Sequence, residues 1–243
     1  MAYLRQQDQD SVRQRFDVEL TRDVGITLFT RQSTSGLYIP GRECPSCEST
    51  QRLLEETSEL SSRLKLDIVD YYAEQERAKS AGVSRIPATL IGSSGSSNIR
   101  VYGLPAGRMF GVLIGGIVLA SSGRKQLGLE TRKSLKRLKE DVHIPVFVTP
   151  NCPHCPSIAH LAHQMGKESP RVVADVVDVQ SLPGIGETYG IKAVPKTVIN
   201  DAVTITGAVG EEALLRGVLR AVSEGADESI EDKDAIGPTT PVN

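Results

Sequence analysis

The chain has 243 residues, of which 39% are hydrophobic and 24% are charged. This length exceeds the usual size of one domain, about 100 to 150 residues, and favours two domains. The 28 Lys and Arg residues against 30 Asp and Glu residues leave a net charge of -2, which excludes a bulk electrostatic attraction to nucleic acid or anionic lipid. We therefore expect a globular protein whose partners include no nucleic acid and no membrane.

Two features of the sequence predict a cytoplasmic location. The first residues, MAYLRQQDQD, are polar and lack the apolar core of a signal peptide. The longest apolar stretch, residues 109–120, is shorter than the roughly 20 residues that cross a bilayer, and it predicts a buried helix. Because the cytoplasmic thiol pool reduces structural disulfides, the four cysteines indicate redox or metal chemistry instead.

The first half of the chain predicts alternating strands and helices from its apolar periodicity and turn residues. In chain order these are a strand at 24–30, a helix from after Cys44 to about Ser61, a strand at 64–70, a helix at 73–81, a strand at 88–92, a strand at 99–103 and a helix from about Ala106.

The second half of the chain predicts the same order of elements. After a cationic connecting helix at 128–140, these are a strand at 142–149, a helix at 153–168, a strand at 171–178, a short helix at 183–189, a hairpin at 196–209 and a helix at 211–223. The order β, α, β, α, β, β, α in each half predicts an α/β fold, with a mixed central sheet flanked by helices. The acidic segment from about Gly225 onward is poor in large apolar residues and is expected to be a mobile tail.

An internal repeat supports this duplication, because separated landmarks share one register. Cys44 and Cys47 fall on Cys152 and Cys155 at a spacing of 108 residues (152 − 44). The same spacing aligns LDIVD at 66–70 with ADVVD at 174–178, and GVSRIPATLI at 82–91 with GIKAVPKTVI at 190–199. We therefore predict one unit at residues 1–124, a second unit with its connecting helix at 125–225 and an acidic tail at 226–243.

Each cysteine pair is expected to open a helix and to act as a redox couple. Residues three apart in a first helical turn lie on one side, with a Cα separation of roughly 5 Å that suits a disulfide. Unpaired N–H groups and the helix dipole stabilise a thiolate there, which lowers the pKa of the thiol. We predict Cys44 and Cys152 as attacking thiols, and Cys47 and Cys155 as the thiols that resolve the mixed disulfide.

The residues between the cysteines are predicted to tune the pKa of the thiols. Pro45 and Pro153 suit the first helical position, where a missing N–H costs nothing. His154 can carry positive charge or donate a hydrogen bond to the neighbouring thiolate, whereas Ser46 is weaker in both respects. Because stabilising the reduced form makes a disulfide more oxidising, we predict that the second pair is the more oxidising one.

Each C-x-x-C pair is followed 43 residues later by the proline of an Ile/Val-Pro-x-Thr segment, and this pattern resembles the two-unit protein disulfide oxidoreductases. These are glutaredoxin-like proteins of thermophilic archaea and bacteria, and RVYGLPAG at 100–107 and VHIPVFVTPNCPHCP at 142–156 are similar to the same family. The resemblance implies two tandem thioredoxin-fold units and cis peptide bonds at Ile86-Pro87 and Val194-Pro195. It also implies that the backbone of Ile86 and Val194 binds an extended client segment by strand addition.

The resemblance further implies a thiol-disulfide oxidoreductase that reduces, forms or isomerises protein disulfides without an organic cofactor or a metal. The expected partners are disulfide-containing client proteins, a thioredoxin-reductase-like flavoprotein and a peroxiredoxin. Two other functions stay open, namely a dedicated electron carrier to a peroxiredoxin and a chaperone module that holds unfolded clients.

Several residues leave alternatives open. Residues 31–43 insert about a dozen residues between the first strand and Cys44, and this loop could cover that thiol or shape a client groove. Four thiolates could instead bind one zinc ion, although zinc ribbons hold their pairs roughly 15 to 20 residues apart. Asp70 and Asp178 match across the repeat and are expected to be turn or cap residues. His160 and His163 share a helical face and are expected to be exposed or partly packed.

Overall fold

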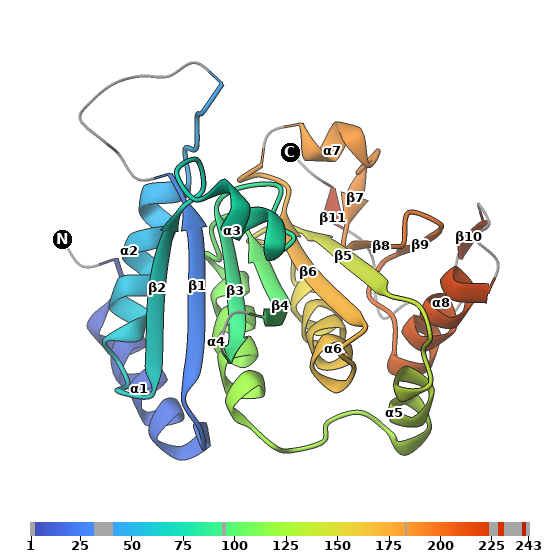
Figure 1. Cartoon of the computed structure of the whole chain (residues 1–243), viewed down its shortest axis with the longest axis horizontal. Coiled ribbons are helices and arrows are strands. Elements are labelled where there is room, and N and C mark those ends of the chain that lie inside the picture. The colour runs from blue at the N-terminus through green and yellow to red at the C-terminus, as the bar shows by residue number, and fades with distance from the viewer. Residues whose placement is uncertain are drawn as a thin grey trace.

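The computed structural model describes residues 3–31, 41–93, 96–182, 184–223, 228–230 and 240–241. Within these residues, one long sheet runs through the molecule and helices cover it on both faces (Figure 1). Most of the inserted segment 31–43, namely residues 32–40, lies outside the described residues.

The first half contains the elements α1 Gln6–Glu19, β1 Val24–Thr30, α2 Cys47–Ser58, β2 Leu64–Asp70, α3 Gln75–Ser80, β3 Ala88–Ser93, β4 Ser96–Tyr102 and α4 Arg108–Ser121. The second half contains α5 Leu129–Lys136, β5 Val142–Val148, α6 Cys155–Glu168, β6 Val172–Asp178, α7 Ile185–Thr188, β7 Ala193–Val194, β8 Lys196–Ile199, β9 Val203–Thr206 and α8 Glu211–Ser223. Two short strands follow, β10 Glu228–Ile230 and β11 Thr240–Pro241.

The main sheet of the described residues has nine strands in the order β10-β9-β8-β5-β6-β4-β3-β1-β2. In each half the first two strands are parallel, β1 with β2 and β5 with β6, and the hairpins β3/β4 and β8/β9 are antiparallel. The halves join where β4 pairs in parallel with β6. The predicted pair of mixed α/β units is confirmed, and their sheets form one continuous sheet, which the sequence pattern did not predict.

Alternating side chains along the strands build separate cores on the two faces of the sheet. On one face, α1, α2 and α4 cover the first half, and α6 and α8 cover the second half. On the other face, a core that contains Phe29 and Phe147 runs across both halves. Because this core crosses the β4–β6 junction, each half buries apolar surface that it would expose alone.

Helices α4 and α6 lie close together beneath this junction. A Cβ atom at Gly115 of α4 would overlap the ring of His160 on α6, so a residue without a side chain is needed at this approach. His163 of α6 is fully buried, and its Nε2 atom lies 3.2 Å from the carbonyl oxygen of Arg100 in β4. The expectation that His163 is exposed or partly packed is therefore wrong, because the joined sheets bury this face of α6.

The structure also contains elements that the sequence pattern did not predict. Helix α1 buries only Val12 and Phe16, so its apolar periodicity is weak. Within the predicted mobile tail, residues 228–230 pair with β9 and residues 240–241 pair with β7. Open strand edges accept backbone hydrogen bonds from a segment of almost any composition, and the rest of the predicted tail lies outside the described residues. Across the described residues, every helix falls short of the length and apolar character that a membrane span requires.

Candidate active sites

The first candidate site is the Cys44–Cys47 disulfide, which lies immediately before and at the start of α2. The two Cα atoms are 5.4 Å apart, within the range that an intrachain disulfide needs. Cys44 is 8% exposed and Cys47 is 3% exposed. The first cysteine is thus the one that a client reaches more easily.

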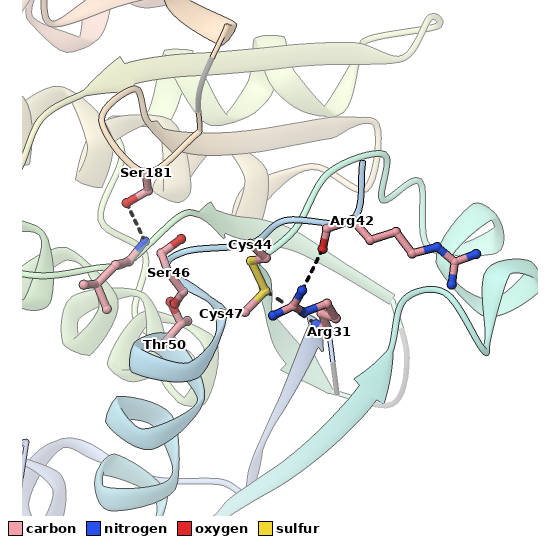
Figure 2. The surroundings of a disulfide bond; sticks show 8 residues. Arg31, Arg42, Cys44, Ser46, Cys47, Thr50 and Ser181 are labelled. Atoms are coloured by element: carbon pink, nitrogen blue, oxygen red, sulfur yellow. Dashed lines mark hydrogen bonds between the residues drawn. A yellow bond between two sulfur atoms is a disulfide. The ribbon is translucent and has the colours of Figure 1, made fainter. Parts of the chain in front are cut away.

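Arg31, the residue that follows β1, contacts this disulfide from the side of the sheet. Its backbone N–H donates a hydrogen bond to Sγ of Cys47, at 3.4 Å. Its guanidinium donates to the carbonyl oxygen of Arg42 at 3.1 Å (Figure 2). Sequence reasoning assigned no role to Arg31, since the inserted loop that follows it interrupts the repeat register.

Two clefts meet at the first disulfide. The larger one, about 770 Å³, is lined by Arg31, Cys44, Pro45, Cys47, Glu48, Gln51, Arg52 and Glu55. The second, about 230 Å³, is lined by Glu43, Cys44, Pro45, Tyr71, Tyr72, Ser84, Arg85, Ile86, Ser181 and Leu182. Ser181 and Leu182 come from the second half of the chain, so both halves shape the approach to Cys44 (Figure 2).

The second candidate site is the Cys152–Cys155 disulfide at the start of α6. Its Cα atoms are 5.5 Å apart, and both cysteines are 0% exposed. The backbone N–H of Cys155 donates to Sγ of Cys152 at 3.2 Å. A first-turn N–H has no partner within the helix and can therefore donate to this sulfur.

The helices begin two residues later than Pro45 and Pro153, which corrects their predicted place at the first helical position. Ser46 and His154 are the N-cap residues of α2 and α6, and the exposed prolines precede them. The proline in the first turn is Pro156, where its missing N–H costs no helical hydrogen bond. The first cysteine of each pair therefore lies outside the helix, three residues before its first residue.

The segments predicted to bind a client lie next to the cysteines in both halves. The Ile86–Pro87 and Val194–Pro195 peptide bonds are cis, as the family resemblance implied. The carbonyl oxygen of Val194 lies 3.9 Å from Sγ of Cys152. Ile86 and Cys44 line the same 230 Å³ cleft. The sequence spacing of 43 residues thus brings each proline segment to its own cysteine pair.

The matched carboxylates Asp70 and Asp178 end their strands in turns, as predicted. Oδ1 of Asp70 accepts from the N–H groups of Tyr72 and Ala73, at 2.9 and 2.8 Å. Oδ1 of Asp178 accepts from the N–H of Gln180 at 3.1 Å, and the Ser181 hydroxyl donates to Oδ2. Burial raises the pKa of the Asp178 carboxyl, and these hydrogen bonds oppose that shift. The Asp178–Ser181 turn thereby holds Ser181 at the first site.

The described residues also bear on the zinc alternative. Each cysteine pair is closed as a disulfide within its own half of the chain. Among the residues that the structure describes, His, Cys, Asp and Glu side chains form no group of three or more that could hold a metal ion. The sulfur atoms are therefore arranged as two separate disulfides.

Comparison with sequence families and curated proteins matches part of the chain. A family model described as a thioredoxin domain matches residues 142–220. The thioredoxin of Methanocaldococcus jannaschii is 37% identical over 78 residues, which are 32% of this chain and 92% of that protein. A probable thioredoxin of Archaeoglobus fulgidus is 34% identical over 88 residues, which are 35% of this chain and 94% of that protein.

Comparison with solved structures matches both halves together. A protein disulfide oxidoreductase from Aeropyrum pernix is similar with 27% sequence identity and a TM-score of 0.80, over 92% of this chain and 95% of that chain. The alkylhydroperoxide reductase AhpF of Enterococcus faecalis is similar with a TM-score of 0.78, over 89% of this chain and 99% of that chain. At 20% identity, this second likeness shows the fold alone.

Proposed function

The chain belongs to the thioredoxin family and is a thiol-disulfide oxidoreductase, and from this premise we propose that its two C-x-x-C pairs are two unequal redox centres. The first centre is Cys44 with Cys47, and the second centre is Cys152 with Cys155. In each, the first cysteine exchanges disulfides with the client, and the second cysteine resolves or releases the mixed disulfide. We propose that neither centre needs an organic cofactor or a metal for this reaction.

The reduced second centre acts by nucleophilic attack. The Cys152 thiolate attacks one sulfur of a client disulfide, the client S–S bond breaks, and the other client sulfur leaves as a thiolate. Cys155 then attacks Sγ of Cys152, closes the intrapair disulfide and releases the second client thiolate. The observation that carries this proposal is the hydrogen bond from the Cys155 N–H to Sγ of Cys152, because a donor aimed at a thiolate lowers the pKa of that thiol.

We propose that clients bind as extended segments along Ile86-Pro87 and Val194-Pro195. The proximity of the Val194 carbonyl oxygen to Sγ of Cys152, 3.9 Å, supports this arrangement at the second centre. A client strand that pairs with the Val194 backbone would carry its own disulfide to the attacking sulfur. At the first centre, the cleft shared by Ile86 and Cys44 supports the same arrangement.

The residues between the cysteines are proposed to tune the two potentials. Pro45 and Pro153 stiffen the chain before each helix, since proline fixes its own φ. His154 is half-buried at the N-cap of α6, whereas Ser46 is buried at the N-cap of α2. A protonated imidazole next to Cys152 would stabilise the reduced form and raise the potential of the second centre.

Insulin-disulfide reduction tests the proposed function. We expect the Cys44→Ser/Cys152→Ser double variant to lose activity by about a hundredfold or more relative to the wild type, because it lacks both attacking thiols. The Cys155→Ser variant should instead accumulate a mixed disulfide with the client, visible by mass spectrometry. If the double variant kept client-dependent activity, the protein would act as a client-binding module without redox chemistry.

We also propose the physiological partners of the protein and its cytoplasmic location. A thioredoxin-reductase-like flavoprotein would return electrons to the centres, and disulfide-containing proteins would be the clients. A peroxiredoxin would be the dedicated partner if its reduction were much faster than that of insulin under the same conditions. Trapping clients with the Cys155→Ser variant in fractionated cells would test the cytoplasmic location, since clients from another compartment would contradict it.

A further inference from the structure

The two centres differ in which sulfur receives a hydrogen bond. At the second centre the N–H of Cys155 donates to the attacking cysteine, Cys152. At the first centre the N–H of Arg31 donates to Cys47, the resolving cysteine. Arg31 follows β1 at the place where Thr149 follows β5, so the two halves carry different residues immediately after the first strand.

Arg31 and Cys47 line the same cleft, of about 770 Å³. The guanidinium of Arg31 donates a hydrogen bond to the carbonyl oxygen of Arg42, which fixes its position. The other charged groups that face this cleft are Glu48, Arg52 and Glu55 from α2, and those that face Cys44 from the smaller cleft are Glu43 and Arg85. Arg52 pairs with Glu48.

We infer that Arg31 is a positioning residue that stabilises the Cys47 thiolate as a leaving group, so that the first centre donates its disulfide to dithiol clients more readily than it would without Arg31. This inference rests on the proposed function. A client thiolate attacks Sγ of Cys44, the Cys44–Cys47 bond breaks, and Cys47 departs with the electron pair as a thiolate. A second client thiolate then attacks the client sulfur of the mixed disulfide, so that the client loses two electrons and Cys44 leaves as a thiolate.

The test uses the full chain with Cys152→Ser and Cys155→Ser, so that only the first centre reacts. Equilibration with reduced and oxidised glutathione measures its thiol-disulfide equilibrium, and the ultraviolet absorbance of the thiolate measures the pKa of Cys47 in a further Cys44→Ser variant. We expect Arg31→Gln to shift the equilibrium about tenfold toward the disulfide, equivalent to about 30 mV, and to raise the pKa of Cys47. Arg31→Lys should restore most of both effects.

Arg63→Gln is the matched control, because Arg63 is an exposed arginine before β2 that pairs with Asp23 and lines neither cleft at the first disulfide. It should leave the equilibrium and the pKa of Cys47 unchanged. An unchanged equilibrium in Arg31→Gln would overturn the inference, as would an equal shift in Arg63→Gln. A centre that never equilibrates with glutathione in any variant would instead contradict the proposed function.

A separate observation concerns the C-terminal segment of the chain. Strand β11 pairs antiparallel with β7, with Thr240 opposite Val194 and Pro241 opposite Ala193. These are the residues whose backbone is proposed to bind clients at the second centre. In Figure 1, β11 lies alongside β7 near the C-terminus of the chain. Strand β10 pairs with β9, and nine residues separate it from β11.

We propose that residues 240–241 occupy the client position of the second centre and compete with clients for it, an inference that again rests on the proposed function. The tail is attached to the same chain, so its effective concentration at β7 is on the order of millimolar, as for other short tethers. A client must displace it before reaching Cys152. The second centre is therefore restrained by its own chain.

Two full-length variants test this restraint in a Cys44→Ser/Cys47→Ser background. Thr240→Pro removes the remaining backbone N–H of this two-residue strand, whereas Thr240→Ala retains it and serves as the matched control. We expect Thr240→Pro to raise kcat/KM for insulin reduction several-fold, mainly through KM, and Thr240→Ala to leave it unchanged. Equal values for the two variants would overturn the proposal.

A cysteine placed in the tail gives an independent measurement. In the same background, Thr240→Cys with Cys155→Ser should form an intramolecular disulfide with Cys152 that excess client peptide suppresses. Ser229→Cys in β10 is the control and should form much less of it. If Thr240→Cys formed no more of this disulfide than Ser229→Cys, the proposal would also be rejected. If the Cys44→Ser/Cys47→Ser variant with its wild-type tail failed to reduce insulin, the proposed function itself would be rejected.

Discussion

The first centre exposes 8% of Cys44 and opens into two clefts, whereas the second centre buries Cys152 and Cys155 completely. The surroundings of the sulfur atoms differ as well. At the first centre, the backbone N–H of Arg31 donates to Sγ of Cys47, and both residues line the same cleft. At the second, the helix-start amide of Cys155 points at the attacking cysteine, and the adjacent client edge is paired with β11.

This difference separates the features that the two halves share from those that they do not. The C-x-x-C spacing and the helix start are shared, and they suffice to bring two sulfur atoms into disulfide geometry in both halves. Arg31 and the terminal strand β11 lie outside the matched landmarks of the repeat. The proposed inequality of the two centres therefore rests on residues outside the repeat.

Removal of one attacking cysteine at a time should reveal the largest difference in rate between the two centres. We expect Cys152→Ser to slow insulin reduction about a hundredfold and Cys44→Ser to slow it less than about threefold. When the oxidised protein oxidises a reduced dithiol client, Cys44→Ser should cause a larger loss than it does in insulin reduction, because Cys47 is the stabilised leaving group. Rates of both reactions for both variants measure the effect.

Ser80→Ala provides a control for this experiment, because Ser80 is exposed at the end of α3. Its two rates should equal those of the wild type. Equal losses for Cys44→Ser and Cys152→Ser in both directions would show that the centres are interchangeable.

Acid should weaken the second half of the protein more than the first. Burial is the main cause that lowers the pKa of His163 on α6 to about 4, while an exposed imidazole in the unfolded chain titrates near 6.5. Between these values the unfolded chain binds a proton that the folded chain does not. The free energy of unfolding should therefore be constant above pH 6.5 and fall by about 3 kcal/mol as the pH approaches 4.

Urea unfolding of the wild type and of His163→Gln at several pH values measures this dependence. The variant should lose most of the slope between about pH 6.5 and 4, because glutamine carries no titratable group. The residue of α2 that matches His163 in the repeat is Glu55, so the first half has no histidine at this position. As the pH falls, amide hydrogen exchange should therefore rise first in α6. If the free energy of unfolding of His163→Gln depended on pH as steeply as that of the wild type, groups other than His163 would cause the acid sensitivity.

Most of the fold was predictable because its determinants are local. The strands β1, β2 and β6 and the helix α8 begin and end within one residue of their predicted bounds, since apolar periodicity and turn residues mark them directly. Helix α1 was missed because only two of its side chains are buried. The joined sheet was missed because the pairing of β4 with β6 leaves no signal in either segment alone.

The sites were predictable to the same extent. The cysteines and the two proline segments were found from spacing and resemblance, and the structure brings each set together. The helix start was predicted too early, so Pro45 and Pro153 lie before the N-cap instead of inside the first turn. Arg31, Ser181 and β11 act through contacts between distant segments, and their sequence surroundings carry no motif.

The smallest expected effect concerns the dipeptide between the cysteines. His154 is half-buried next to Cys152, and its replacement by serine should shift the thiol-disulfide equilibrium of the second centre toward the disulfide by about threefold to tenfold, or at most about 30 mV. Equilibration of the isolated second centre with glutathione measures this shift.

The reciprocal substitution, Ser46→His, should not produce an equal and opposite shift at the first centre. Ser46 is 8% exposed and its hydroxyl has no hydrogen-bond partner among the described residues. A histidine there would crowd the start of α2, so Ser46→His should destabilise the first half before it raises the potential of the first centre. If the wild-type centres had equal potentials, the prediction that the second pair is the more oxidising one would be wrong.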